Sequence, residues 1–490
     1  MSPNKPNLLV IHADQHRHDC IGAAGNKDVK TPNIDALARD GTIFTHCFAT
    51  FPVCTPSRYS LLTGLYAHQH LGFTNQSTIP DVIPTFPRIL RHAGYATACV
   101  GKMHFTPTYL DVGFEKMLLA EQDGPGRYDD DYHRYLMAKG AIDFTDARDQ
   151  VLEFRTKAPP AYFANFGTDR SALDDRDFST TWIGDRALEC IDTWNGGGGN
   201  LLMAGFIKPH HPLDAPSPWA DMYDPEKIAL LPGWTETCLD RDRAFSKGFF
   251  DYTKLDEARM RRIMAQYYAS ISQIDAQVGK MVELLKNKGL YDDTLVIYTS
   301  DHGDYMGFHH LVLKGNYMYD PVIRVPLVVK APGQKGSKVV SNLVSIIDIT
   351  AKVIDAAGCL VPRDLWDQVQ PVDEADRDVI FAEDGNKNYM VRTRNRKLLL
   401  CSTFPSQLFD LEKDPIEMEN RIDDAAYQDD VARLKEALFK WLAFESRPPA
   451  YENLGAKSVT GKNIPAAPAK SHERVKGWYR QQMDALSRRA

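Results

Sequence analysis

The sequence predicts an α/β fold, a doubly wound and mostly parallel sheet with a smaller C-terminal α+β domain. Short β-rich apolar runs alternate with amphipathic helical patterns through most of the 490 residues, as in parallel sheets whose two faces are covered by helices. Polar residues follow each of the clearest runs, and sheets of this kind bind ligands beyond the carboxyl ends of their strands. We therefore expect the functional site at that edge.

Four apolar runs predict strands that carry polar residues to this edge. They cover residues 8–12, 95–100, 201–207 and 295–298. The segments that follow them are Ala13-Asp14-Gln15, Gly101-Lys102-Met103-His104, Lys208-Pro209-His210-His211 and Ser300-Asp301-His302-Gly303-Asp304. Because the carboxyl ends of parallel strands share one edge, these segments are expected to line one pocket.

Helical patterns separate the strands. A proline near the start and a glycine at the end bound a helix over residues 31–41. Apolar residues at helical spacing predict a longer helix over residues 260–285. Residues 106–180 are interpreted as long loops over the pocket, and the Gly-rich stretch 195–200 as a flexible link between a helix and the next strand.

After residue 360 the pattern changes. Runs at 379–382, 390–393 and 397–401 predict antiparallel strands, and residues 431–444 predict a helix. We therefore divide the chain into an α/β catalytic domain at 1–370, a small α+β domain at 371–445 and a C-terminal extension at 446–490. A last helix is expected in the extension, from about residue 471 onward.

Composition excludes several classes of protein. The apolar fraction of 43% and the charged fraction of 25% are ordinary for a globular domain, and a net charge of −7 offers no basic surface for nucleic acid. No apolar run reaches the roughly 20 residues that span a bilayer, so no membrane partner is expected. No signal peptide precedes the first strand, which predicts a cytoplasmic protein, or a periplasmic or secreted one if a leader has been removed.

One of the eight cysteines stands apart. Seven are scattered without paired spacing and are interpreted as free buried thiols. The eighth lies in Cys54-Thr55-Pro56-Ser57-Arg58, followed by Leu62-Thr63-Gly64. Pro56 suits the first turn of a helix that ends at Gly64, which would place residue 54 beside unpaired backbone N–H groups that attract an anion.

This motif matches the sulfatase signature, and the chain resembles the sulfatase family of the alkaline phosphatase superfamily. Further family elements occur in the family's order: Thr31-Pro-Asn-Ile-Asp35, Gly101-Lys-Met-His104, Pro209-His-His-Pro212, Ser300-Asp-His-Gly303, Arg324-Val-Pro-Leu327 and Phe409-Asp-Leu-Glu-Lys-Asp414. The resemblance runs from about residue 7 to residue 421 and implies an alkaline-phosphatase-like fold.

The resemblance also implies the chemistry. Cys54 would be oxidised to formylglycine by a formylglycine-generating enzyme, and the hydrated aldehyde offers two hydroxyls. One attacks sulfur and expels the alcohol, and the other, once deprotonated, expels sulfate and restores the aldehyde. Arg58 would hold this hydrate, Lys102 and Lys314 would bind sulfate oxygens, His104 would take the second hydroxyl's proton, and His210 would protonate the alcohol.

A divalent metal belongs to the same implied site. Its ligands would be Asp14, Gln15, the residue-54 hydroxyl, Asp301 and His302, a set that suits Ca²⁺ and leaves Mn²⁺ as the alternative. Many sulfatases have Asp-Asp at positions 14 and 15 and Asp-Asn at 301 and 302. His309 is expected to bind substrate. His211 and His310 are expected as solvated loop residues, and a substrate contact from His68 or His70 stays open.

Three functions are weighed. The first is hydrolysis of a sulfate monoester, of a small molecule or an oligosaccharide and most plausibly of a sulfated carbohydrate. The second is a formylglycine-dependent phosphonate monoester or phosphodiester hydrolase, because the same hydrate can attack phosphorus. The third, a non-catalytic binding protein on this scaffold, requires a lost nucleophile or ligand, and the sequence keeps them all. Assembly into a homo-oligomer stays open.

Overall fold

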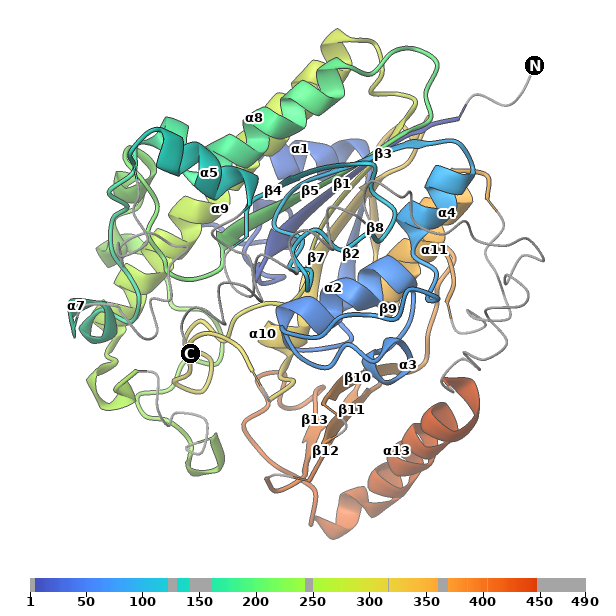
Figure 1. Cartoon of the computed structure of the whole chain (residues 1–490). Coiled ribbons are helices and arrows are strands. Elements are labelled where there is room, and N and C mark those ends of the chain that lie inside the picture. The colour runs from blue at the N-terminus through green and yellow to red at the C-terminus, as the bar shows by residue number, and fades with distance from the viewer. Residues whose placement is uncertain are drawn as a thin grey trace, which may run out of the picture.

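The computed structural model describes residues 5–121, 130–141, 160–242, 250–315, 317–359, 369–385, 387–402 and 404–446. Two sheets and their helices make up this part of the chain (Figure 1). The expected C-terminal extension, with its last helix, lies outside the described residues apart from Ser446. Among the described helices, none combines the length and the apolar character needed to span a membrane.

The large sheet confirms the expected mostly parallel architecture. Its strands are β1 (Asn7–Asp14), β2 (Thr42–Phe48), β3 (Ala96–Gly101), β4 (Lys116–Leu119), β5 (Asn200–Pro209), β6 (Thr294–Ser300), β7 (Arg324–Lys330), β8 (Lys338–Val340) and β9 (Val344–Ser345). They follow the order β4-β3-β5-β1-β6-β7-β2-β8, with β9 paired to β2. Only β7 among these strands runs antiparallel to its neighbours, β6 and β2.

Helices cover both faces of this sheet because its central strands are apolar on both sides. Along β1, Leu8 and Val10 face one core, while Leu9 and Ile11 face the other. The first core contains side chains of α2 (Cys54–Thr63), α4 (Phe86–His92) and α11 (Ile346–Ala356). The second contains side chains of α1 (Pro32–Asp40), α5 (Asp131–Ala138), α8 (Ser179–Asp192) and α9 (Glu257–Asn287).

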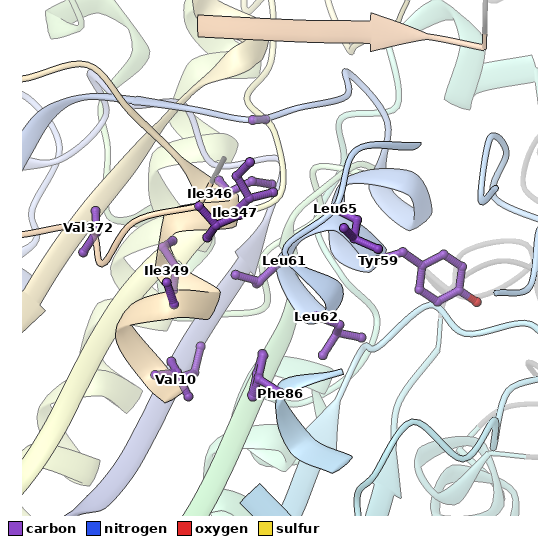
Figure 2. Close-up of a cluster of buried hydrophobic side chains, with 14 of the residues drawn as sticks. Val10, Tyr59, Leu61, Leu62, Leu65, Phe86, Ile346, Ile347, Ile349 and Val372 are labelled. Carbon is purple, nitrogen blue, oxygen red and sulfur yellow. The ribbon is translucent and has the colours of Figure 1, made fainter. Parts of the chain in front are cut away.

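Figure 2 shows how the first core fixes α2, the helix that begins at Cys54. Leu61 and Leu62 of α2 point toward Val10 of β1, Phe86 of α4 and Ile349 of α11. All five side chains are at most 1% exposed. Burying side chains of this size contributes roughly 1.5–3 kcal/mol each, so the start of α2 is held firmly over the sheet.

The smaller C-terminal unit is an antiparallel sheet with a helix, as expected. Its strands, in order, are β10 (Ile380–Asp384), β11 (Asn388–Arg392), β12 (Arg396–Cys401) and β13 (Gln407–Asp410). The helix is α13 (Gln428–Lys440), continued by a π-helical turn at Trp441–Glu445. The remaining helices are short: α3 (Ala67–His70), α7 (Pro160–Ala164) and α10 (Asp320–Ile323).

Residues 106–180 differ from the expectation of loops alone. They contain β4, which pairs in parallel with β3 and adds an edge strand to the large sheet. They also contain α5, α7 and a 3₁₀ turn at Asp175–Asp177. Other 3₁₀ turns lie at Gly22–Ala24, Trp219–Asp221, Pro225–Lys227, Asp240–Asp242, Tyr252–Lys254 and Ala425–Tyr427. The Gly-rich stretch 195–200 does link α8 to β5.

Candidate active site

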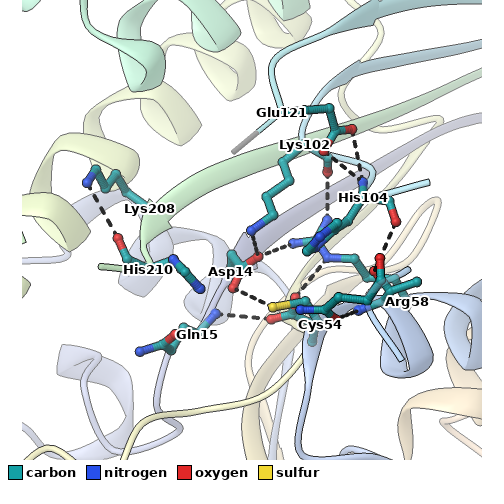
Figure 3. A network of polar contacts seen from close by, with 12 residues as sticks. Asp14, Gln15, Cys54, Arg58, Lys102, His104, Glu121, Lys208 and His210 are labelled. Atoms are coloured by element: carbon teal, nitrogen blue, oxygen red, sulfur yellow. Dashed lines mark hydrogen bonds and ion pairs between the residues drawn. The ribbon is translucent and has the colours of Figure 1, made fainter. Parts of the chain in front are cut away.

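The four polar segments come together at the carboxyl edge of the large sheet (Figure 3). Asp14 ends β1, and Asp301 directly follows β6, the neighbouring strand. Lys102 follows β3, and His210 follows β5. The pairing of β1 with β5 shifts register between His12 and Asp14, and such irregularities re-aim side chains near functional sites.

Cys54 is the first residue of α2 and is fully buried. The residue before it, Val53, is extended and has no side chain that could cap the helix. Instead, Asn75 Oδ1 accepts the N–H of Thr55 at 3.1 Å, and Pro56 has no N–H to offer. Fewer unpaired N–H groups therefore lie beside residue 54 than the sequence suggested, because a later loop supplies an acceptor.

Asp14, Cys54, Asp301 and His302 form a buried cluster whose ligand atoms all lie within 4.8 Å of one another. His302 Nε2 lies 3.2 Å from Cys54 Sγ and 3.8 Å from Asp14 Oδ1. Its Nδ1 lies 2.9 Å from the carbonyl oxygen of Gly303. That nitrogen therefore carries the proton, and Nε2 presents its lone pair to the cluster, as in histidines that bind metals.

Two cations stabilise the carboxylates of this cluster from the side. Arg58 donates from Nε to Asp301 Oδ2 at 2.8 Å and from a terminal nitrogen to Asp14 Oδ2 at 2.9 Å. Lys102 Nζ lies 2.7 Å from the same Asp14 oxygen. Burial and Asp301 oppose the charge, but Lys102 and Arg58 hold the pKa of Asp14 at about 2. Both Oδ1 atoms remain directed at the cluster.

The donor set fits a hard divalent cation. Two buried carboxylates repel each other, and a bound cation relieves that repulsion. Burial and the Asp14 carboxylate raise the pKa of the Cys54 thiol to about 11. An unmodified Cys54 is therefore a neutral thiol in the metal-free site.

Gln15 lies beside this cluster, and its amide groups already have partners. Its Oε1 accepts a hydrogen bond from Lys314 Nζ at 2.6 Å, and its Nε2 donates to Asp304. Its backbone N–H donates to Asp301 Oδ1 at 3.0 Å. The structure thus places both Gln15, expected as a metal ligand, and Lys314, expected to bind sulfate, next to the cluster and against each other.

His104 is 2% exposed, and neither ring nitrogen has a hydrogen-bond partner among the described residues. Burial, Lys102 and Arg58 hold its pKa well below the usual range, so the ring is neutral and able to accept a proton. Its backbone is better fixed: the N–H donates to Glu121, and the carbonyl accepts from Thr55 Oγ1 at 3.0 Å.

His210 is held by the loop that follows β5. Its Nδ1 lies 2.6 Å from the carbonyl oxygen of His211, which leaves Nε2 for other contacts. Burial and the charge of Lys314 hold the pKa of His210 well below its usual range. The buried Lys208 donates to the carbonyl oxygen of Pro212 and to Asp214, so it ties this loop together.

Several histidine predictions need correction. His309, expected to bind substrate, has both ring nitrogens engaged, with Asp242 Oδ2 at 3.0 Å and the carbonyl oxygen of Ile416 at 2.8 Å. Its role in substrate binding therefore stays a prediction. His211 and His310, expected as solvated, are 1% and 3% exposed. The rings of His68 and His70 also have internal partners: Glu383 and Ser446 for His68, and Ser60 and Gly72 for His70.

Three buried charged residues of the site were not predicted as functional. Glu121 supports the segment around His104, Lys208 supports the loop around His210, and Asp304 contacts Gln15. Glu121 follows the short strand β4, so the rule that located the other polar segments also applies to it. That strand has only four residues and was interpreted as loop.

Comparison with known proteins agrees with this geometry. The family model described as Sulfatase matches residues 6–359. A second model, described as N-sulphoglucosamine sulphohydrolase, C-terminal, matches residues 307–443. Together they account for the large sheet, the cluster around Cys54 and the smaller sheet.

Individual proteins show the same likeness. An arylsulfatase of Clostridium perfringens is 30% identical over 93% of this chain and 98% of its own length. An N-acetylglucosamine-6-O-sulfatase of Bacteroides thetaiotaomicron is 26% identical over 86% of this chain and 84% of its own length. The crystal structure of a phosphonate monoester hydrolase of Agrobacterium radiobacter superposes with a TM-score of 0.71 at 25% identity, over 89% of this chain and 95% of that chain.

Proposed function

The chain belongs to the sulfatase family of the alkaline phosphatase superfamily and is a sulfuric ester hydrolase, and from this premise we propose that it removes sulfate from a sulfated carbohydrate through a formylglycine made from Cys54. The observation that carries the proposal is the buried cluster of Asp14, Cys54, Asp301 and His302. It lies beside a lysine ammonium and within reach of the loops that carry His104 and His210 (Figure 3).

The proposed metal is Ca²⁺, with Mn²⁺ as the alternative. Asp14, Asp301 and His302 would hold it together with the residue-54 hydroxyl, and the amide oxygen of Gln15 faces the same region. Carboxylate oxygens favour Ca²⁺, and the imidazole nitrogen leaves room for Mn²⁺. When bound, such an ion neutralises charge on the sulfate ester and lowers the pKa of a hydroxyl next to it.

The chain's own residues divide the reaction into two halves. Lys102 and Lys314 would bind sulfate oxygens and orient sulfur toward one hydroxyl of the residue-54 hydrate. As the new S–O bond forms and the ester S–O bond breaks, His210 would give its proton to the departing alcohol. His104 would then take the proton of the second hydroxyl, so that the C–O bond to sulfate breaks and the aldehyde C=O forms again.

Support for a carbohydrate substrate comes from a relative. The Bacteroides thetaiotaomicron protein of similar sequence is named an N-acetylglucosamine-6-O-sulfatase. A sugar alkoxide is a poor leaving group, so its departure requires a general acid, and the buried His210 is the proposed donor. The sulfated position on the sugar depends on loops around the site, which carry no general code.

A second candidate function is hydrolysis of phosphonate monoesters or phosphodiesters. The structural similarity to the Agrobacterium radiobacter phosphonate monoester hydrolase, at a TM-score of 0.71, favours it. A phosphoryl centre carries negative oxygens like a sulfuryl centre, and the same lysines and metal could bind it. The two functions therefore require the same residues, and only the turnover rates of matched substrates distinguish them.

The test compares both chemistries on one preparation. The chain is produced together with a formylglycine-generating enzyme, and the Cys54 peptide is weighed; conversion removes roughly 18 Da, the difference between a thiol and an aldehyde. Turnover is then measured with an aryl sulfate and an aryl phosphonate monoester as the matched pair, and with sulfated mono- and oligosaccharides. Faster turnover of the sulfates supports the proposal, whereas an active protein whose Cys54 is an unmodified thiol overturns the mechanism. Cys54→Ala is the inactive control.

A further inference from the structure

We propose that Glu121 is a positioning residue that aims the His104 ring at the residue-54 hydrate. The inference rests on the proposed function and deepens it, because it explains how a histidine without hydrogen bonds of its own can serve as a base. Glu121 contacts neither the reacting atoms nor the metal-binding cluster in the described contacts. It acts through the backbone N–H groups of Met103 and His104, whereas the N–H of Lys102 is held separately by the carbonyl oxygen of Gly205 in β5.

The carboxylate of Glu121 is built into the turn after β3. Oε1 accepts the N–H of Met103 and the N–H of His104, each at 3.0 Å, and Oε2 accepts the N–H of His104 at 3.1 Å. The side chain is 2% exposed. A carboxyl group keeps acceptor capacity in both protonation states, so these contacts to two successive N–H groups fix the turn by their geometry. Figure 3 shows Glu121 on one side of this turn.

The backbone that Glu121 holds is not one a histidine adopts readily. His104 has a φ of 58°, in the left-handed region where residues other than glycine are uncommon. A residue other than glycine keeps this strained conformation only when the surroundings enforce it. Glu121 provides this restraint on the N–H side, and Thr55 Oγ1 provides it on the carbonyl side.

The ring depends on this restraint. Neither ring nitrogen of His104 has a partner among the described residues, so no hydrogen bond to the ring fixes its direction. Only the backbone conformation and the packing around the ring can do so. Thr55 follows Cys54 directly in α2. The hydrogen bond from Thr55 Oγ1 to the His104 carbonyl oxygen therefore also ties the His104 segment to the nucleophile.

The position of Glu121 in the fold explains how it reaches this turn. It comes two residues after β4, the edge strand that pairs in parallel with β3. The carboxyl ends of both strands therefore lie together, and Glu121 faces the residues that follow β3. The backbone N–H of Glu121 donates to Asp130 Oδ2 at 2.9 Å, which also holds the backbone of Glu121 in place.

Asp275, a buried carboxylate similar to Glu121, provides a control that separates an effect on His104 from a general loss of stability. Asp275 of α9 accepts the N–H groups of Asn33 and Ile34, at 3.0 and 2.7 Å, and is 2% exposed. It is thus a buried carboxylate that caps two successive backbone N–H groups, as Glu121 is. It supports the start of α1 and has no contact with His104 among the described interactions.

The inference makes a specific kinetic prediction for Glu121→Ala. With 4-nitrophenyl sulfate the first half of the reaction needs little help, because nitrophenolate leaves easily, and the second half waits for His104. Misplacing the base by about 1 Å can cost roughly 10²-fold. We expect kcat and KM to fall together by about this factor while kcat/KM stays near the wild-type value, since kcat/KM reports the unaffected first half.

The experiment compares wild type, Glu121→Ala, Glu121→Gln and Asp275→Ala, all converted at Cys54. Rapid mixing should show a fast burst of one nitrophenol per active site in Glu121→Ala, followed by slow turnover, and the residue-54 peptide should accumulate with one added sulfate group. Glu121→Gln keeps an acceptor oxygen and should restore most of kcat. Burial raises the pKa of Glu121 to about 8, so the neutral amide resembles its protonated form. Asp275→Ala should lower the thermal midpoint without a burst.

A second readout does not depend on conversion. In the unconverted thiol form, with ¹⁵N-labelled histidine, the His104 resonance is identified by its loss in His104→Gln. It should shift or broaden in Glu121→Ala and stay unchanged in Asp275→Ala. If Glu121→Ala does not fold, Glu121→Asp replaces it, because its shorter side chain withdraws the carboxylate by about one C–C bond, ~1.5 Å.

The outcomes distinguish this inference from the proposed function. A wild-type protein that is not converted or does not hydrolyse sulfate esters overturns the proposed function. An active wild type whose Glu121 variants lose kcat and kcat/KM equally, without a burst, overturns the inference alone, as does an unmoved His104 resonance. A burst with accumulation of the sulfated residue supports it.

Discussion

Arg58 shows how one side chain can organise the carboxylates of the site. Its guanidinium donates to Asp14, to Asp301 and to the carbonyl oxygen of Lys102, the last at 2.6 Å. The planar group with its fixed donors is well suited to such a task. Arg58 is therefore engaged by the protein through all three donors, and the proposed function assigns the binding of sulfate to Lys102 and Lys314.

Substitution of His210 should separate leaving-group chemistry from sulfate binding. A sugar alkoxide needs a proton to depart, whereas a nitrophenolate leaves with little help. We expect His210→Ala to slow a sulfated sugar by roughly 10²–10⁴-fold, the usual size of general acid catalysis, and to slow 4-nitrophenyl sulfate much less. The pKa of His210 is low because of burial and Lys314, and a bound sulfate anion offsets this by favouring the protonated ring.

Lys102→Ala is the comparison for that measurement. The sulfate group is common to both substrates, so loss of Lys102 should reduce both values of kcat/KM by similar factors. Equal losses for both substrates in His210→Ala would instead place His210 in sulfate binding and exclude the acid role.

Some residues of the site could be predicted from sequence and others could not. The position of Asp14, Asp301 and His302 at one edge was predicted from the apolar runs before them, and their role as metal ligands was implied by the resemblance to sulfatases, as was that of Cys54 from its local motif. The engagement of His309 with Asp242 could not be foreseen, since the two residues are 67 positions apart and meet only in the folded chain. Similarly, His310 contacts Trp234, Thr235 and Tyr252, which are far from it in the sequence.

At the scale of elements, the cluster joins three separate parts of the fold. Asp14 ends β1, Cys54 begins α2, and Asp301 and His302 follow β6. Ser57 Oγ of α2 adds a hydrogen bond of 2.6 Å to the carbonyl oxygen of Asp301. A cation at this junction would therefore hold a helix against two strands as well as take part in chemistry.

Removal of the metal should accordingly lower stability together with activity. An ion that binds only the native state stabilises it by ~2.7 kcal/mol when its free concentration is a hundred times the Kd. We expect the thermal midpoint to fall on chelation and to recover with Ca²⁺ or Mn²⁺, and turnover to follow. In Asp301→Asn the midpoint should no longer respond to either ion. Full activity with no metal detectable after exhaustive chelation would contradict the metal site.

The elements themselves were predictable in part. Long periodic segments such as α9 and apolar runs such as β1, β5 and β6 were located correctly. Strands β2, β7, β8 and β9 of the large sheet were not predicted, although β2 and β7 have seven residues each. Strands β4 and β13 were missed as well, and each has only four residues. So short a run has little periodicity, and its strand conformation depends on the neighbour that it pairs with.

At the scale of the whole molecule, a buried charge network joins the two sheets. Asp320 begins α10, next to the large sheet, and receives two hydrogen bonds from Arg392 of β11, at 3.1 and 2.8 Å. Lys397 of β12 lies 3.0 Å from Asp320 and 2.7 Å from Glu417. Gly303, directly after His302, donates its N–H to Val322 of α10 at 2.6 Å. The network thus connects the smaller sheet to the segment that carries a proposed metal ligand.

The charge state of this network makes the stability of the folded protein depend on pH. Burial opposes the ionisation of Asp320, but Arg392 and Lys397 hold its pKa well below the usual range. A carboxylate whose pKa is lower in the folded than in the unfolded state contributes stability above the unfolded value, about pH 4. That contribution is lost as the pH falls further, through the folded pKa.

Lys397→Met should therefore destabilise the whole protein near neutral pH. The substitution keeps the volume but leaves Asp320 and Glu417 without the cation between them, and breaking a buried ion pair costs about 3–5 kcal/mol. Lys335→Met is the matched control, because Lys335 pairs with Asp292 at 2.9 Å on the surface, where such pairs matter little. At pH 7 the thermal unfolding midpoint of Lys397→Met should be clearly lower than that of Lys335→Met. The difference in midpoint between Lys397→Met and wild type should decrease below about pH 4, as Asp320 is protonated. Equal midpoints for Lys397→Met and Lys335→Met at pH 7 would show that the network does not hold the two sheets together.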